Sequence, residues 1–314
     1  MMKRKIFSLA CLAAGLAFSA AAQTQTQTQE EYIRRYNNMV SRVGASGVGV
    51  ETLLDKWEAD WPESLDMLMG RVLYFFDKCQ ETRVVLKEKN RFLGEQPTLA
   101  LKDSLGNDVN YFQETFYDDE LFGRAVSFLE KAIQLAPDRL DLRQNKIAAL
   151  IAYEKESPDM ALSDIKTLID YNASRKPAWI YPGEEVDKEY FDAVIQEYCY
   201  VFFRYATPRC YDAFRDISQR MLDYEPDNVL FLDNLGSYYF IARHDNKTAL
   251  KYYNKVLKIK KDDLTAIRNC VLLARNAKDT KLEKKYLPMM VKYAETETDR
   301  LSAQGRLNYL NGRK

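Results

Sequence analysis

One stretch of the sequence, residues 232–261, constrains the fold more than any other part of the chain. Its small and apolar residues recur at spacings of three and four on each side of a polar linker. This spacing places side chains on one face of a helix, so the stretch predicts two helices joined by a turn. Because Gly236 and Ala249 have little or no side chain, we expect the helices to pack closely there. The residues that set the spacing are Leu232, Leu235, Gly236, Tyr239, Ala249 and Tyr253.

The second half of this pattern recurs along the chain, as a small or apolar residue followed four positions later by a large one. Matches begin at positions 125, 161, 213, 249 and 282. Their separation is close to 34 residues except after position 161, where a longer interval predicts an insertion. The last match is weak, because Pro288 interrupts it. The chain is therefore predicted to be built from similar helix pairs.

This spacing resembles the tetratricopeptide repeat (TPR), whose pattern is W-x2-L-G-x2-Y, then A-x3-F, then P. The resemblance covers roughly residues 119–295. It implies an all-α fold, a TPR-like helical-hairpin solenoid that winds as a right-handed superhelix of about five to six helix pairs. Repeats of this kind present a binding surface and bring no chemistry of their own.

The domain map follows from this interpretation. We expect one repeat domain over residues 31–314, with an insertion at 80–118 and an irregular loop at 172–186. Alternating residues on both sides of 104–107 predict a short hairpin within the insertion. A last helix at 298–311 is expected to cap the open end of the stack, since terminal repeats are often atypical.

Residues 1–22 resemble a secretory signal peptide. A positive start at Lys3–Lys5 precedes an apolar run and the small residues Ala20–Ala22. We expect cleavage before Gln23, a flexible Gln/Thr leader over residues 23–30, and an exported, periplasmic protein. A lipid anchor at Cys11 is the weaker alternative, because only a short apolar stretch precedes that cysteine.

The charge balance excludes some classes of partner. The chain has 46 basic and 46 acidic residues, and removal of residues 1–22 takes away three basic residues and no acidic ones. A near-neutral, slightly acidic chain lacks the basic field that nucleic acid requires. No later segment is apolar enough for a stable membrane span. The four cysteines that remain are expected to be buried and apolar rather than paired: Cys79, Cys199, Cys210 and Cys270.

The residues needed for common chemistries are missing. The single histidine, His244, falls in a polar linker and is interpreted as a solvated turn residue. One histidine excludes a catalytic triad and a histidine-based zinc site. Glycine-rich phosphate loops do not occur. We therefore expect no catalytic residues, no metal and no cofactor.

The resemblance also implies a binding groove, because consecutive first helices line the inner face in this family. Asn234 and Asn269 fall at the same place in their repeats, where a side-chain amide can bond a peptide backbone. Asp233 stands where a carboxylate clamp would need lysine, so that clamp is not expected. An ordinary solvated helix face remains the alternative. The predicted groove residues are Asp233, Asn234, Ser237, Phe240, Ile241, Arg268, Asn269, Leu272, Arg275 and Asn276.

Two further features are candidates for function. Trp179 and Tyr181 in the irregular loop either contact a ligand or fill the space between neighbouring repeats. Asp103-Ser104-Leu105 resembles the O-glycosylation acceptor of exported Bacteroidetes proteins, which implies modification at Ser104. The chain is interpreted as a non-enzymatic scaffold of the cell envelope that binds a protein or peptide. The alternatives are an envelope glycan or small-ligand binder, and a structural assembly factor.

Overall fold

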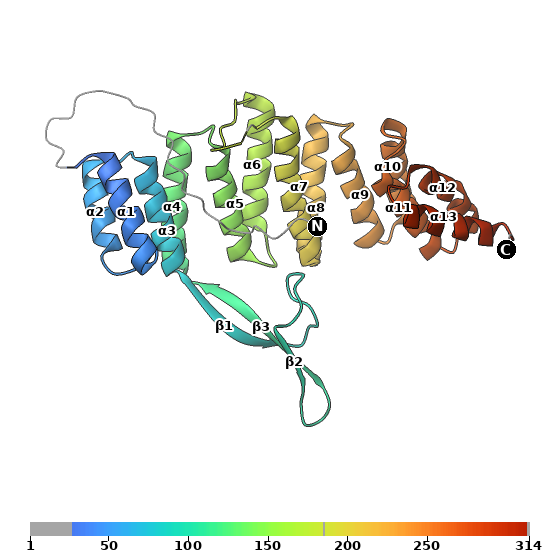
Figure 1. Ribbon diagram of the computed structural model, residues 1–314, viewed down its shortest axis with the longest axis horizontal. Coiled ribbons are helices and arrows are strands. Elements are labelled where there is room, and N and C mark those ends of the chain that lie inside the picture. The colour runs from blue at the N-terminus through green and yellow to red at the C-terminus, as the bar shows by residue number, and fades with distance from the viewer. Residues whose placement is uncertain (1–26, 185, 313–314) are drawn as a thin grey trace. The chain divides into compact units, whose positions relative to one another are not determined.

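The computed structural model describes residues 27–184 and 186–312. Within them the chain forms thirteen α-helices and one three-stranded sheet (Figure 1). The chain divides into two compact units, which are described separately. The first unit holds the described residues up to 87 together with 98–149 and 177–187, and the second holds 88–97, 150–176 and the described residues from 188 onward.

The N-terminal helix α1 (Gln29–Val43) begins inside the predicted leader. The predicted signal peptide and residues 23–26 lie outside the described residues. At Thr28 the side chain accepts a hydrogen bond from the Glu31 amide, and the Glu31 carboxylate accepts one from the Thr28 amide. This capping box satisfies two amides that the first turn leaves unpaired. The leader predicted to run to residue 30 therefore ends before residue 28.

Helices α2 (Val50–Asp60), α3 (Leu65–Lys78) and α4 (Asp119–Leu135) complete the first unit with the start of α5 (Leu140–Glu154). Helices α3 and α4 form the closest pair among them. Their core is rich in aromatic rings, and Tyr32 of α1 stacks on Trp57 with ring centres 5.7 Å apart. Because these large side chains are almost completely buried, they hold the first two helices to α3.

The predicted insertion forms an antiparallel sheet of three strands in the order β1-β3-β2. Strand β1 (Gln80–Lys87) follows α3, and β3 (Asp108–Tyr117) leads into α4 (Figure 1). Strand β2 (Leu99–Lys102) and β3 make the predicted hairpin, whose turn is fixed by the Asp103 carboxylate. This carboxylate accepts hydrogen bonds from the Leu105 and Asn107 amides.

Consecutive helix pairs make up the second unit. First helices contact each other in the order α7, α9, α11, and each also packs on its own second helix, α8, α10 or α12. This is the TPR-like helical-hairpin solenoid that the sequence predicts. The helices are α6 (Asp159–Arg175), α7 (Lys188–Tyr205), α8 (Pro208–Tyr224), α9 (Val229–Ile241), α10 (Asn246–Ile259), α11 (Leu264–Asn276), α12 (Thr280–Tyr293) and α13 (Glu297–Leu310).

The crossing of α9 and α10 depends on Gly236, as its position in the pattern predicts. A Cβ added there would collide with the ring of Tyr253, which is fully buried. Ala249 is also fully buried. Only glycine lets the two helices approach this closely.

One bound in the sequence interpretation is wrong, and the weak match around Pro288 forms a continuous helix. The irregular loop predicted at 172–186 starts later, because α6 continues to Arg175 and ends at Lys176 in the left-handed conformation. Helix α12 also runs through Pro288 without ending there. Pro288 removes one backbone hydrogen bond, but its exposed position and the packing of α12 on α11 and α13 keep the helix intact.

The last three helices are joined by one carboxylate. Glu283 of α12 has a side chain only 2% exposed, and it receives hydrogen bonds from Arg275 of α11 and Arg306 of α13. These bonds, with that to Arg306 the larger influence, hold the pKa of Glu283 below its ordinary value. The carboxylate therefore fixes α13 against the end of the stack.

Two expectations about the whole chain can be compared with the described residues. The four cysteines at positions 79, 199, 210 and 270 are buried free thiols, as predicted. Burial raises the pKa of the Cys79 thiol to about 11 and that of the Cys270 thiol to about 12. Within residues 27–184 and 186–312, no helix is both long and apolar enough to cross a membrane.

Candidate functional site

All ten predicted groove residues lie on α9 and α11, two first helices that contact each other. The structure does not leave them equally available. Ile241 and Leu272 are 40% and 46% exposed. Ser237 is half-buried, and its hydroxyl lies 3.3 Å from the Tyr253 hydroxyl within its own repeat.

Asn234, predicted to bond a peptide backbone, is already paired within the chain. Its side chain is buried and forms a reciprocal amide pair with Gln196 of α7, with N–O distances of 3.0 and 2.7 Å. Both ends of the amide are occupied, so Asn234 joins successive repeats. Asn269, at the same place in the next repeat, is half-buried.

Asp233 also has a role between repeats. Its carboxyl is hydrogen-bonded to Asp263, which caps α11 by accepting a hydrogen bond from the Ala266 amide at 3.1 Å. Burial first, and then the charge of Asp263, raises the pKa of Asp233 to about 8. A carboxyl group at this position offers no positive charge for a carboxylate clamp.

The two predicted groove arginines already have partners. Arg275 is bound to the buried Glu283, with an N–O distance of 2.6 Å. Arg268 lies 3.3 Å from Asp299 of α13 in a pair that is exposed on both sides. A strong pair to a buried carboxylate is costly to break, whereas an exposed pair contributes little. Arg268 is therefore the more available of the two.

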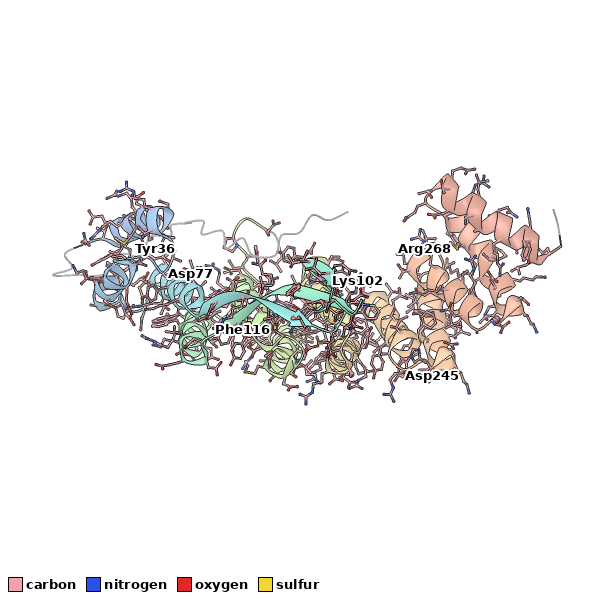
Figure 2. The ribbon with its side chains drawn as sticks, turned by 90° about the horizontal axis from the view of Figure 1, so that it is seen from below. Tyr36, Asp77, Lys102, Phe116, Asp245 and Arg268 are labelled. Carbon is pink, nitrogen blue, oxygen red and sulfur yellow. The ribbon has the colours of Figure 1, made fainter. Side chains whose placement is uncertain are left out.

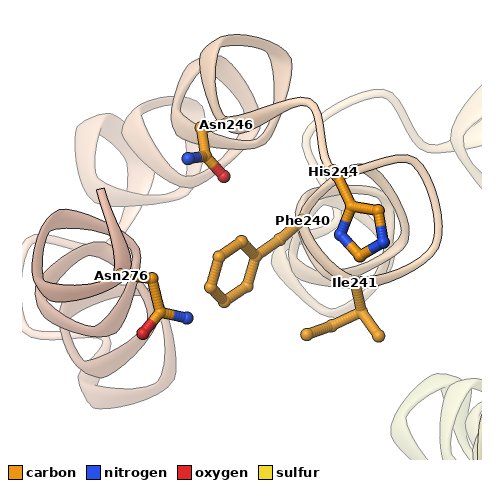
Figure 3. Close-up of a pocket in the computed structure, with 5 residues that line it drawn as sticks. All are labelled: Phe240, Ile241, His244, Asn246 and Asn276. Atoms are coloured by element: carbon orange, nitrogen blue, oxygen red, sulfur yellow. The ribbon is translucent and has the colours of Figure 1, made fainter.

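A hollow of about 330 Å³ lies where α9, α10 and α11 meet. The Phe240 ring points into its centre, between the amides of Asn246 and Asn276, with Ile241 and His244 on the other side (Figure 3). His244 takes the left-handed conformation at φ 52°, which turns the chain from α9 into α10. Sequence reasoning found Phe240, Ile241 and Asn276 but missed Asn246, and it treated His244 only as a solvated turn residue.

A second hollow of about 300 Å³ shares Ile241 and His244 with the first. It lies between the α7–α8 turn and the end of α9, and its wall includes Tyr211, Asp212 and Arg243. The Asp212 carboxylate accepts a hydrogen bond from the Tyr238 hydroxyl at 3.0 Å. The two hollows therefore lie on neighbouring turns with Ile241 and His244 between them. We call them together the turn furrow.

The loop that holds Trp179 and Tyr181 belongs to the first unit. Ile180 forms two backbone hydrogen bonds there, donating to Asp138 and accepting from Leu140, which fix the loop to the turn before α5. The Arg143 guanidinium lies 5.6 Å from the centre of the Trp179 ring. One face of the ring is therefore already occupied. Neither aromatic residue lines the turn furrow.

Ser104 lies in the exposed turn between β2 and β3. The hydrogen bonds of the Asp103 carboxylate hold this turn without involving the Ser104 hydroxyl. Among the described residues, no group of three or more His, Cys, Asp or Glu side chains is placed to hold a metal ion.

Comparisons with known proteins add little to this picture. No family model matches the chain, and no curated protein matches it either. Similar solved structures include the MamA protein, at 13% identity and a TM-score of 0.34, covering 59% of this chain and 84% of MamA. The P58(IPK) TPR domain has 14% identity and a TM-score of 0.32, covering 90% of this chain and 65% of that domain.

A monomeric mutant of IFIT1 with Gppp-AAAA is also similar, at 10% identity and a TM-score of 0.29, covering 92% of this chain and 60% of IFIT1. The chain thus spans about two thirds or less of the P58(IPK) and IFIT1 structures that it matches. With TM-scores below 0.5, these likenesses add nothing to what the pairing of the helices itself shows.

Proposed function

We propose that this chain is an exported, non-enzymatic scaffold that binds a protein partner by holding an extended segment of it in the turn furrow. One observation carries the proposal. Asn246 and Asn276 lie on either side of the Phe240 ring, and neither side-chain amide has a hydrogen-bond partner among the described residues (Figure 3).

The chemistry of these amides suits a peptide backbone. Each side-chain amide offers two N–H donors and a carbonyl acceptor, and an extended backbone presents N–H and C=O groups in alternation. Two amides on opposite sides of a hollow can therefore hold a backbone that passes between them. The paired Asn234 cannot do this, because Gln196 already occupies its donor and acceptor.

The apolar part of the hollow would supply most of the affinity. Phe240 and Ile241 are apolar, and a volume of about 330 Å³ lies at the lower end of the range for ligand pockets. One or two bulky peptide side chains fit such a space better than a cofactor does. Arg243, in the wall of the second hollow, favours an acidic residue beside the apolar one.

Export is supported by the sequence of residues 1–22, with its positive start, apolar run and small residues at the cleavage site. A periplasmic scaffold would meet partners that lie in or pass through the envelope. The glycan-binding alternative has weaker support, because Arg143 covers one face of Trp179, the ring it would need.

The test is selection from a random peptide library on the immobilised chain, followed by affinity measurement with the selected peptides. The double variant Asn246→Ala/Asn276→Ala should weaken their binding by roughly 10- to 30-fold, since two hydrogen bonds contribute about 1 kcal/mol each. The matched control is Asn37→Ala/Asn38→Ala, which removes two exposed amides from α1. Equal affinity of all three proteins, or the absence of any selected peptide, would exclude the furrow as a peptide site.

A further inference from the structure

The two faces of the sheet in the first unit differ completely in charge. Paired residues of antiparallel strands place their side chains on the same face, so the register assigns every strand residue to a face. We call the first the charged face, and its charged residues are Glu81, Arg83, Lys87, Lys102, Asp108 and Glu114. Among the described strand residues, none on the opposite face carries a charge. We call it the uncharged face, and its apolar and aromatic centre is Val84, Leu86, Leu99, Leu101, Val109 and Tyr111.

Apolar side chains on the uncharged face are more exposed than residues at the centre of the charged face, which is the reverse of what the composition of the two faces predicts. Val84 is 68% exposed and Leu86 59%, both on the uncharged face. On the charged face, Asn110 and Phe112 are each only 3% exposed. An antiparallel sheet with one face in water normally places its polar residues on that face. The uncharged face therefore has the composition of a surface that is covered by another layer.

The charged face, by contrast, is satisfied within the chain. Lys87 pairs with Glu114, and Lys102 pairs with Asp108, each at 2.8 Å. The Arg83 guanidinium is bonded to Glu81 and lies over the Phe116 ring. Lys102 and Phe116 mark opposite ends of the sheet (Figure 2). The face whose large aliphatic side chains remain exposed is thus the uncharged face.

We propose that a second copy of this chain covers the uncharged face, with the two sheets packed face to face. In a two-fold contact the same residues meet from both sides. A surface without charges meets itself without like-charge repulsion and without burying an unpaired charge. Nucleic acid and anionic membranes need positive charge at the contact, and this face has none.

The area of the face suits a modest dimer. The strands have 8, 4 and 10 residues. Adjacent strands lie about 4.8 Å apart and rise about 3.3 Å per residue, which gives a face of about 350 Å² per copy. Two copies would bury about 700 Å², less than a standard stable interface, so we expect a transient dimer that dissociates at about 10–100 µM.

A different dimer could form through the free edge of β1, which is the outer strand of the sheet. The two arrangements are separable because β2 lies at the opposite edge from β1. A charge placed on the uncharged face of β2 would disrupt face-to-face packing but leave an edge-to-edge contact through β1 intact.

The test is sedimentation of the full chain over 1–100 µM, comparing Leu101→Glu and Leu99→Glu with Ala100→Glu. Ala100 lies on the same strand but on the charged face, so Ala100→Glu controls for a new acidic residue in β2. The unmodified chain and Ala100→Glu should dimerise, and the two leucine variants should dissociate at least tenfold more readily. Circular dichroism melting would show that the variants remain folded.

A second measurement uses a pyrene label on a cysteine introduced by Leu101→Cys or Ala100→Cys. This measurement uses the chain without residues 1–22, which contain Cys11. The four remaining thiols at positions 79, 199, 210 and 270 are buried, so the introduced thiol is the one that reacts. Excimer emission is expected for the label at position 101 and not for that at position 100. An unmodified chain that stays monomeric at 100 µM, or leucine variants that dimerise as it does, would overturn the proposal.

Discussion

At the residue scale, the sequence was most informative at a position where one added carbon atom would prevent two helices from packing. Gly236 was predicted from spacing alone to lie at a helix crossing, and the collision that a Cβ would make with Tyr253 confirms it. Asn234 was assigned to the binding groove because its position in the repeat pattern faces the inner surface. The pattern cannot show that Gln196 from the neighbouring repeat reaches the same amide.

Replacing Gly236 with alanine should therefore destabilise the chain. The Tyr253 ring is fully buried and has no room to move, so the extra methyl group would force the helices apart. We expect a loss of about 1–3 kcal/mol in the free energy of unfolding, measured in urea. The control is Gly305→Ala, because a Cβ there meets no atom within 4 Å and helical alanine is favoured. Equal stabilities of both variants would contradict the close crossing.

The carboxyl pair of Asp233 and Asp263 predicts an unusual pH dependence. Asp233 has a pKa of about 8 in the folded chain, whereas an ordinary aspartate ionises near 3.8. Between these values the folded chain binds the extra proton, so its contribution to stability is complete below about pH 4 and is lost as pH rises through 8.

Asp233→Asn removes this ionisation and keeps the shape of the side chain. We expect it to stabilise the chain by about 1–2 kcal/mol at pH 8 and to flatten the dependence of stability on pH. Thermal unfolding from pH 5 to pH 9 would measure both effects. The exposed neighbour provides the control, since Asp262→Asn should leave the pH profile unchanged. A profile that is equally steep in both variants would argue against the raised pKa of Asp233.

At the element scale, helices were predicted well and strands less well. Repeated apolar spacing predicted paired helices along the chain, because a helical face must be continuous to pack. Strand β1 was missed, although Thr82–Leu86 is rich in β-branched residues. Its pairing with β3 joins residues that are more than twenty positions apart, which a local pattern does not reveal.

Because Glu283 pairs with Arg275 of α11 and Arg306 of α13, the packing of α13 depends on one carboxylate. Its lowered pKa means that its contribution to stability is present above about pH 4.5 and is lost as pH falls through the folded value. Glu283→Gln should cost about 1–2 kcal/mol at pH 7 and should make the last helix easier for a protease to remove. Limited proteolysis with mass spectrometry would follow residues 297–312. Glu295→Gln, an exposed change nearby, should have no such effect.

At the scale of the whole molecule, the sequence predicted the fold class and only part of the candidate site. The solenoid follows from the recurring spacing, and Phe240, Ile241 and Asn276 were found because they lie on first helices. His244 lies in the turn between α9 and α10, and Asn246 is the first residue of α10. Both were missed because their side-chain directions depend on a left-handed residue rather than on periodicity.

Export and modification can be examined together in the intact protein. The mass of the chain from its native host should correspond to a start at Gln23, with an added glycan that is absent from Ser104→Ala. Cleavage is the expectation from the sequence of residues 1–22, and the turn at Ser104 is exposed in the structure. A mass that includes residues 1–22 would exclude processing, and an unmodified mass would exclude the glycan.

The position of His244 also makes the molecule convenient for spectroscopy. The chain has one histidine, and this residue forms part of both hollows of the turn furrow. In untagged protein, a single imidazole resonance would therefore report on the furrow without any spectral assignment. Each added peptide could be followed by one peak.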